Sequence, residues 1–165
     1  MKSIEGSWVG EGSGRYPPRV EEFFYVEELT ISPTSKPTGW EIRSVTRQRD
    51  TGQPMHSEVG HFRAPLGDSV EMTCSHPFGV TEVSSGNIVV EEGENACTRM
   101  QLIASEDSLH RTPTAKSPRT TGLRRTYVMS PDKSSLTFSM DMATDNHPEL
   151  QHHLLSKLTR KTAPV

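Results

Sequence analysis

The sequence predicts an all-β protein, either a β-sandwich or an up-and-down β-barrel. Two observations predict this fold class. Roughly nine or ten short segments are rich in aromatic and β-branched residues, and turn residues bound them at intervals of about 8–15 residues. No alternation of strand and helix patterns appears, which excludes a parallel sheet built from βαβ units. We find no internal repeat, and the 165 residues fit a single domain that spans 1–165.

The charge and cysteine content exclude several classes of protein. The net charge is −3, and acidic and basic residues are mixed along the chain, so nothing points to nucleic acid or an anionic membrane as a partner. Cys74 and Cys97 make no disulfide framework, which predicts a reduced, intracellular protein. There is no apolar signal region at the N-terminus and no run of the ~18 apolar residues that a membrane span needs, so we expect a soluble, cytoplasmic protein.

The first predicted strand begins at Trp8, in a segment rich in glycine. Glycines at positions 6, 10, 12 and 14 rule out the interior of a helix and allow sharp bends or the close approach of another backbone. They do not form a phosphate-binding loop, because the segment lacks both the strand–turn–helix context and the Lys-Ser/Thr ending.

The later segments alternate apolar and polar residues, as strands with one buried face do. Ser85-Gly86 is interpreted as the turn of a hairpin. The polar segment 105–122 is the one long irregular stretch, and such loops are usually functional or mobile. Residues 152–161 fit both helical and strand spacing. The strands predicted after the first are 20–31, 40–46, 55–63, 70–76, 80–83, 87–91, 96–104, 123–129 and 136–142.

Three histidines near the C-terminus are candidate metal ligands. His147, His152 and His153 lie within seven positions, just after Met140 and Met142. Imidazole is the commonest protein ligand for iron, zinc and copper, and methionine supplies an adaptable apolar wall, as a haem pocket requires. Solvated surface histidines would give the same spacing. A shared zinc site is disfavoured, because the adjacent pair cannot easily bind one ion and no cysteine or carboxylate stands at a familiar spacing.

The chain carries four motifs in order: Gly6-x-Trp8-x-Gly10-x-Gly12 with Tyr16-Pro17, Pro54-Met55-His56-x-Glu58-x-Gly60, Val70-Glu71 with His76-Pro77-x-Gly79, and Met142-Ala143-Thr144 with Gln151-x-His153-Leu154-x-x-x-Leu158. Together they resemble the nitrobindin family over nearly the whole chain. The resemblance implies a ten-stranded antiparallel β-barrel, similar in shape to fatty-acid-binding proteins, that holds haem b at its mouth. It also implies a haem-dependent peroxynitrite isomerase that forms nitrate, reversible nitric oxide binding, and a capacity to form homodimers.

The resemblance places the axial iron ligand, and with it the catalytic role, on His153. The family's histidine stands in Gln-x-His-Leu, and Leu154 and Leu158 keep that register here. The spacing from Met142 to His153 is one residue longer than in the family pattern, which suggests an insertion near Asn146-His147. If that loop is displaced, His152 becomes the rival ligand.

Two further cofactor contacts implied by the resemblance depart from the family pattern. Pro18 stands where the family often has the threonine of Tyr-Pro-Thr, so a hydroxyl near the cofactor is missing. Thr126 stands where the family often has a basic residue, and Arg125 beside it points to the other side of its strand by parity. The remaining residues expected to line the pocket are Met55, His56 and Met142.

A second function is compatible with the predicted barrel. The protein could be a non-catalytic carrier of a small apolar ligand such as a fatty acid. A carrier of this kind needs inward-facing basic residues for the ligand's carboxylate, and the sequence does not place any.

Overall fold

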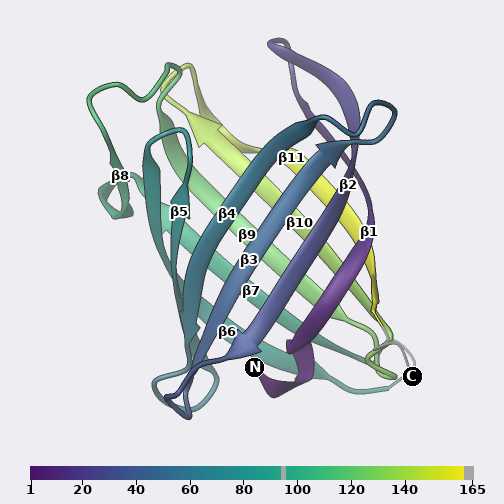
Figure 1. Cartoon of the computed structure of the whole chain (residues 1–165). Coiled ribbons are helices and arrows are strands. Elements are labelled where there is room, and N and C mark those ends of the chain that lie inside the picture. Colours follow the sequence, from purple (N-terminus) through teal and green to yellow (C-terminus); the bar gives the residue numbers. More distant parts are fainter. Residues whose placement is uncertain (94–95, 162–165) are drawn as a thin grey trace.

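The computed structural model describes residues 1–93 and 96–161, and these form one antiparallel sheet that closes on itself (Figure 1). Ten strands make the barrel, and the three-residue strand β8 pairs with β6 only. The elements are η1 (Lys2–Ile4), β1 (Gly6–Tyr16), β2 (Val20–Pro33), β3 (Gly39–Gln48), β4 (Pro54–Arg63), β5 (Ser69–His76), β6 (Val80–Glu91), β7 (Cys97–Ser105), η2 (Glu106–Ser108), β8 (Leu109–Arg111), β9 (Thr120–Met129), β10 (Ser135–Thr144) and β11 (His147–Arg160). The predicted all-β class and the ten-stranded antiparallel barrel are confirmed.

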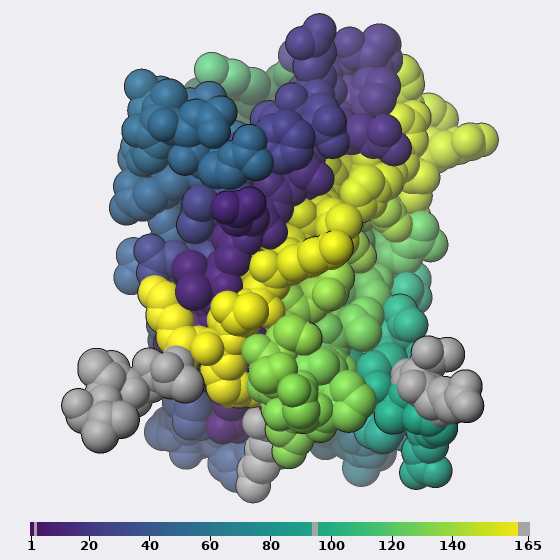
Figure 2. All heavy atoms as spheres, turned by 90° about the vertical axis from the view of Figure 1, so that its right-hand side faces the viewer, coloured from purple at the N-terminus to yellow at the C-terminus, as the bar shows by residue number. Residues whose placement is uncertain are grey.

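Two pairings close the barrel, β5 with β6 and β1 with β11. β5 is the first strand of the strand order and β6 stands next to its far end, so their pairing closes the sheet into a ring. β1 pairs with both β2 and β11, so the first and last strands lie side by side, and Figure 2 shows β11 between β1 and β10. The ambiguous segment 152–161 is therefore strand up to Arg160, because β11 supplies the partner that both β1 and β10 need.

Along the barrel axis, the inward-facing side chains change from a packed apolar core to the lining of a cavity, as β2 shows. On β2, Leu29 and Ile31 belong to a buried apolar core, whereas Phe23, Tyr25 and Glu27 line a cavity. One end of the barrel is thus packed with apolar side chains, and the other end holds the cavity. Large residues of the core include Trp8, Ile42, Phe62, Met72, Leu102 and Leu136.

The predicted hairpin at Ser85-Gly86 is wrong, because both residues lie within the continuous strand β6. Gly86 pairs with Val70 on β5 and with Leu102 on β7. A Cβ atom added at Gly86 would lie 1.7 Å from the carbonyl oxygen of Gln101. The glycine therefore allows a neighbouring backbone to come close, which is the other common reason for glycine in a strand.

Replacement of Gly86 by alanine should lower the free energy of unfolding by about 1–3 kcal/mol, since the backbone of β7 must move. Gly122→Ala is the matched control. Gly122 also lies in a strand, but the atom nearest to its added Cβ, the Ala143 Cβ, is 3.5 Å away, an ordinary contact. Urea denaturation of both variants measures the difference. Equal stabilities would mean that the approach of β6 and β7 at Gly86 is not as close as described.

The segment 105–122 is less irregular than the sequence predicts. It contains η2, whose capping box links Ser105 and Ser108, and β8, which pairs with the start of β6. Within residues 1–93 and 96–161, no helix has the length and apolar character that crossing a membrane requires. Cys74 is buried, Cys97 is half-buried, and neither forms a disulfide.

Candidate functional site

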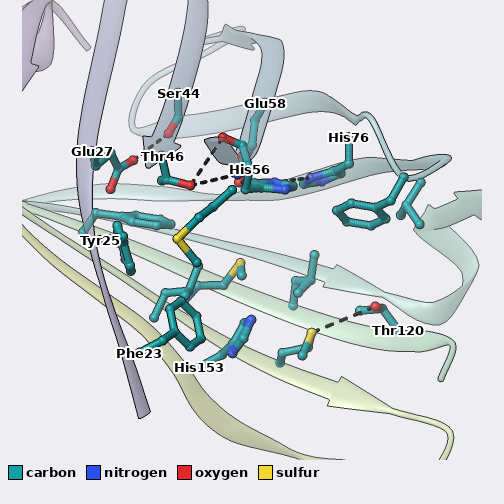
Figure 3. Close-up of a pocket in the computed structure, with 18 residues that line it drawn as sticks. Phe23, Tyr25, Glu27, Ser44, Thr46, His56, Glu58, His76, Thr120 and His153 are labelled. Atoms are coloured by element: carbon teal, nitrogen blue, oxygen red, sulfur yellow. Dashed lines mark hydrogen bonds and ion pairs between the residues drawn. The ribbon is translucent and has the colours of Figure 1, made fainter. Parts of the chain in front are cut away.

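A cavity of about 250 Å³ lies inside the barrel, at the end away from the apolar core (Figure 3). Four predicted pocket residues, Met55, His56, Met142 and His153, line it. Figure 3 shows His153 on one wall and His56 with His76 on the wall that faces it. The apolar part of the lining includes Phe23, Leu123, Phe138, Met140 and Leu154.

A bulge in β11 turns His153 toward the cavity. Leu154 pairs with Met140 on β10, but the next pair is His152 with Asp141, so His153 is the extra residue. Buried Ser156 and Leu158 show which face of β11 points inward. Without the bulge, the alternation of a strand would point His152 inward and His153 outward. The bulge therefore selects His153, rather than His152, as the histidine that faces the cavity.

A hydrogen bond fixes the protonation of the His153 ring. Its Nδ1 lies 3.0 Å from the carbonyl oxygen of Arg15. Because a carbonyl oxygen only accepts, Nδ1 carries the proton and Nε2 keeps its lone pair. Burial lowers the pKa of His153, which favours the neutral ring. The edges of Tyr16 and Phe23 pack near the ring, with centroids 5.7 and 6.5 Å away. His153 therefore presents an oriented, neutral nitrogen ligand to the cavity.

The other two C-terminal histidines do not join His153. His152 is exposed, and its Nδ1 lies 3.5 Å from Oδ1 of Asp141. His147 lies against the edge of Tyr16, with ring centroids 6.0 Å apart. Neither residue lines the cavity. The disfavoured zinc site of these three histidines does not form among the residues described, since no metal-ligating cluster there includes them.

The facing wall carries a pair of stacked imidazoles. His56 and His76 have ring centroids 5.4 Å apart, and Nε2 of His56 lies 3.2 Å from Nδ1 of His76. Phe78 stacks against both rings. Val59 of β4 pairs with Ser75 of β5, and this register brings the end of β5 beside His56 and Glu58.

A buried ion-pair cluster lies below the imidazoles. Nη1 of Arg125 forms an ion pair with Oε2 of Glu58 (2.9 Å), and Nη2 forms one with Oε2 of Glu82 (2.9 Å). Nε of Arg125 donates a hydrogen bond to Oε2 of Glu82 (3.0 Å). β4 and β9 are not neighbours in the sheet, so the pair with Glu58 crosses the barrel interior. Burial is the largest single effect and raises the pKa of both carboxyls, but the Arg125 guanidinium together with the neighbouring imidazoles, His56 at Glu58 and His76 at Glu82, holds their pKa values below the usual range. Both glutamates are therefore ionised.

A third carboxyl, Glu27, lies in the same interior, and no ion-pair partner for it is found among the described residues. The hydroxyl of Ser44 donates to its Oε1 (2.7 Å) and that of Ser156 to its Oε2 (2.5 Å). The phenol of Tyr25 shares a further hydrogen bond with Ser156 (2.8 Å). Burial raises the pKa of Glu27 despite these hydrogen bonds. The floor of the cavity is thus polar and acidic.

Two predicted cofactor contacts are not brought to the cavity. Pro18 is exposed in the turn between β1 and β2. Thr126 lies on the outer face of β9, where its hydroxyl accepts a hydrogen bond from Gln101 (3.4 Å). Alternation along β9 buries its neighbour Arg125 instead. Neither Pro18 nor Thr126 is among the residues that line the cavity.

Sequence reasoning did not find the roles of His76, Glu82 and Arg125. His76 and Glu58 stand inside motifs quoted above, but their spacing along the chain does not bring them together. Strand register and barrel closure make the contact. The available signal was parity, because Arg125 shares the alternation of the apolar residues Leu123, Tyr127 and Met129.

The chain matches a known family and several named proteins. The family described as "THAP4-like, heme-binding beta-barrel domain" matches residues 1–160. "Peroxynitrite isomerase 2" of Mycobacterium avium (strain 104) is 36% identical over 161 residues, which cover 98% of this chain and 92% of that protein. "Peroxynitrite isomerase" of Nocardia farcinica is 36% identical over 162 residues, covering 97% and 88%. The crystal structure of Rv2717c from M. tuberculosis superposes with a TM-score of 0.84 at 32% identity, covering 97% of this chain and 94% of that one.

Proposed function

Since the chain belongs to the THAP4-like, haem-binding β-barrel (nitrobindin) family, we propose that it is a haem-dependent isomerase that converts peroxynitrite to nitrate. The activity comes from relatives named peroxynitrite isomerase that match over nearly their whole length. The observation in this chain that supports it is the geometry of His153. Its Nδ1 donates to the Arg15 carbonyl, so Nε2 is left as a neutral ligand atom at the cavity.

The residues of the cavity fit a haem. His153 would hold the iron, as a histidine does whose second nitrogen donates to a backbone carbonyl. Apolar side chains of Phe23, Met142 and Leu154 would contact the porphyrin face. Met55 and His56 also line the cavity, and His56 lies on the wall that faces His153. The contacts predicted for Pro18 and Thr126 stay predictions, and the positions of these residues outside the lining do not support them.

When bound, ferric haem would supply Lewis-acid chemistry toward peroxynitrite. The chain contributes two things. His153 would hold the iron, and its hydrogen bond to the Arg15 carbonyl orients the ring and raises its basicity. The apolar wall limits water in the cavity, which strengthens electrostatic interactions there.

Reconstitution with haemin tests the proposal. We expect a Soret band of histidine-ligated haem and, in stopped-flow measurements, peroxynitrite decay faster than with free haemin at the same concentration. Nitrate should account for the consumed peroxynitrite. If haem binds but peroxynitrite decays at the rate in buffer, the protein is a haem protein without this activity.

The alternative is a non-catalytic carrier of a small apolar ligand. Among the described residues that line the cavity, none is lysine or arginine, and the nearby Arg125 is already paired with Glu58 and Glu82. A fatty-acid carboxylate would thus meet acidic groups, which disfavours this function. Displacement of a fluorescent fatty acid without any haemin binding would support the carrier.

Three expectations from the resemblance extend the proposal. Reversible nitric oxide binding is tested by titrating the ferrous haem protein with nitric oxide. A homodimer is tested by sedimentation. A cytoplasmic location is supported by the two free cysteines, Cys74 and Cys97.

A further inference from the structure

The facing imidazoles and one carboxylate form a compact donor cluster away from His153. One ring nitrogen each of His56 and His76 and one carboxylate oxygen of Glu58 all lie within 4.8 Å of one another. Glu58 is buried and His56 borders the cavity, so an ion entering from the mouth can reach all three atoms. We propose that His56, Glu58 and His76 bind a divalent transition-metal ion, at a site distinct from the haem ligand His153.

The distances suit tetrahedral coordination. Nε2 of His56 lies 3.2 Å from Nδ1 of His76 and 3.4 Å from Oε1 of Glu58. Ligand atoms at the Zn–N distance of about 2.0–2.1 Å in a tetrahedral site lie about 3.3–3.4 Å apart. The third distance, between His76 and Glu58, is below 4.8 Å, so a modest movement of these side chains would complete the geometry.

The local charge also favours a cation. Glu58 and Glu82 are both buried and ionised, but they share the single guanidinium of Arg125. Glu58, Glu82 and Arg125 together therefore carry one excess negative charge, and uncompensated charge is costly to bury. A divalent ion bound by Glu58 and two neutral imidazoles would compensate it.

The groups behind the three ligands are arranged as in metal sites. Arg125 holds Oε2 of Glu58 (2.9 Å), which leaves Oε1 for an ion. Nε2 of His76 is buried without a hydrogen bond and lies 3.7 Å from Oε2 of Glu82. A proton on that nitrogen would face the carboxylate and leave Nδ1 as the ligand atom, the usual carboxylate–histidine–metal arrangement.

The donor set indicates the class of ion. Two imidazoles and one carboxylate with open positions are typical of zinc and of non-haem iron(II), whereas magnesium and calcium prefer oxygen ligands alone.

The alternative to a metal site is a simple hydrogen bond between His56 and His76, one ring donating to the other. That pair would have no affinity for metal ions, so a binding measurement separates the two.

The test uses the full chain, freed of metal with a chelator and dialysed. Titration of the haem-free protein with Co²⁺ should give visible d–d absorption that saturates at one ion per chain, and calorimetry with Zn²⁺ should give the same stoichiometry. The haem-loaded protein should also bind one Zn²⁺ per chain in calorimetry, because the site does not include His153. Absence of saturable binding in the haem-free protein would overturn the proposal.

Variants locate the ion. His56→Ala and His76→Ala should each weaken Zn²⁺ binding by at least about tenfold. His56 is partly exposed, so its variant is expected to fold even if the buried His76 variant does not. The controls His152→Ala and His153→Ala should leave the affinity unchanged, since neither residue belongs to the cluster. Binding that survives loss of His56, or that needs His152 or His153, would place the ion elsewhere and refute the site.

Discussion

Replacement of His153 by alanine should abolish the histidine-ligated Soret spectrum of the haem-loaded protein and the peroxynitrite turnover that depends on it. His153 is the histidine that the β11 bulge turns into the cavity. Its Nδ1 donates to the Arg15 carbonyl, so Nε2 is left available to bind iron. The axial bond supplies much of the specific hold on iron, whereas burial of the porphyrin supplies the rest. Some haem is therefore expected to stay bound with an altered spectrum.

His152→Ala is the matched control, because it removes the adjacent imidazole from the solvent side of the same strand. The spectra of both variants are recorded with equal haemin. If the His152 variant loses histidine ligation and the His153 variant keeps it, the bulge does not select the ligand as described. If neither spectrum changes, the iron binds elsewhere.

Replacement of Arg125 by methionine should lower the free energy of unfolding at neutral pH by about 3–5 kcal/mol. Methionine keeps the volume of the aliphatic stem but leaves Glu58 and Glu82 buried without their shared cation. Such a loss is a large part of the stability of a typical domain. Urea denaturation followed by circular dichroism measures it.

Arg124→Met tests the neighbouring arginine, which pairs with Asp141 (2.7 Å) on the outer face with a side chain that is 40% exposed. Exposed pairs contribute little, so this change should cost less than about 1 kcal/mol. Similar losses in the two variants would mean that the interior pair is hydrated and weak.

The effect of Arg125→Met should also depend on pH. The guanidinium holds the pKa values of Glu58 and Glu82 below the unfolded value of 4.5, so the pairs stabilise the fold above that pH. As the pH falls below 4.5 toward the lowered pKa values, this contribution is lost. The difference in stability between the wild type and the variant should therefore narrow in acid, and a constant difference would rule out the ion pairs as its cause.

Local sequence pattern determined the class of this fold and most of its strands. Alternation of apolar and polar residues is a property of a few neighbouring residues, so it predicted the strands at 20–31, 55–63 and 123–129, each found within or overlapping a strand of the barrel. The motif around Leu154 and Leu158 also pointed to His153, which the structure places at the cavity.

Contacts between distant segments were decided only by the tertiary structure. Gly86 looks like a turn until β7 lies against it, and residues 152–161 look equally helical until β1 and β10 pair with them. The bulge at His153 and the cluster of His56, His76 and Arg125 depend on strand register and barrel closure. Register is set by long-range pairing energies that no short window of sequence contains, and a shift of one residue turns every side chain of a strand to the other face.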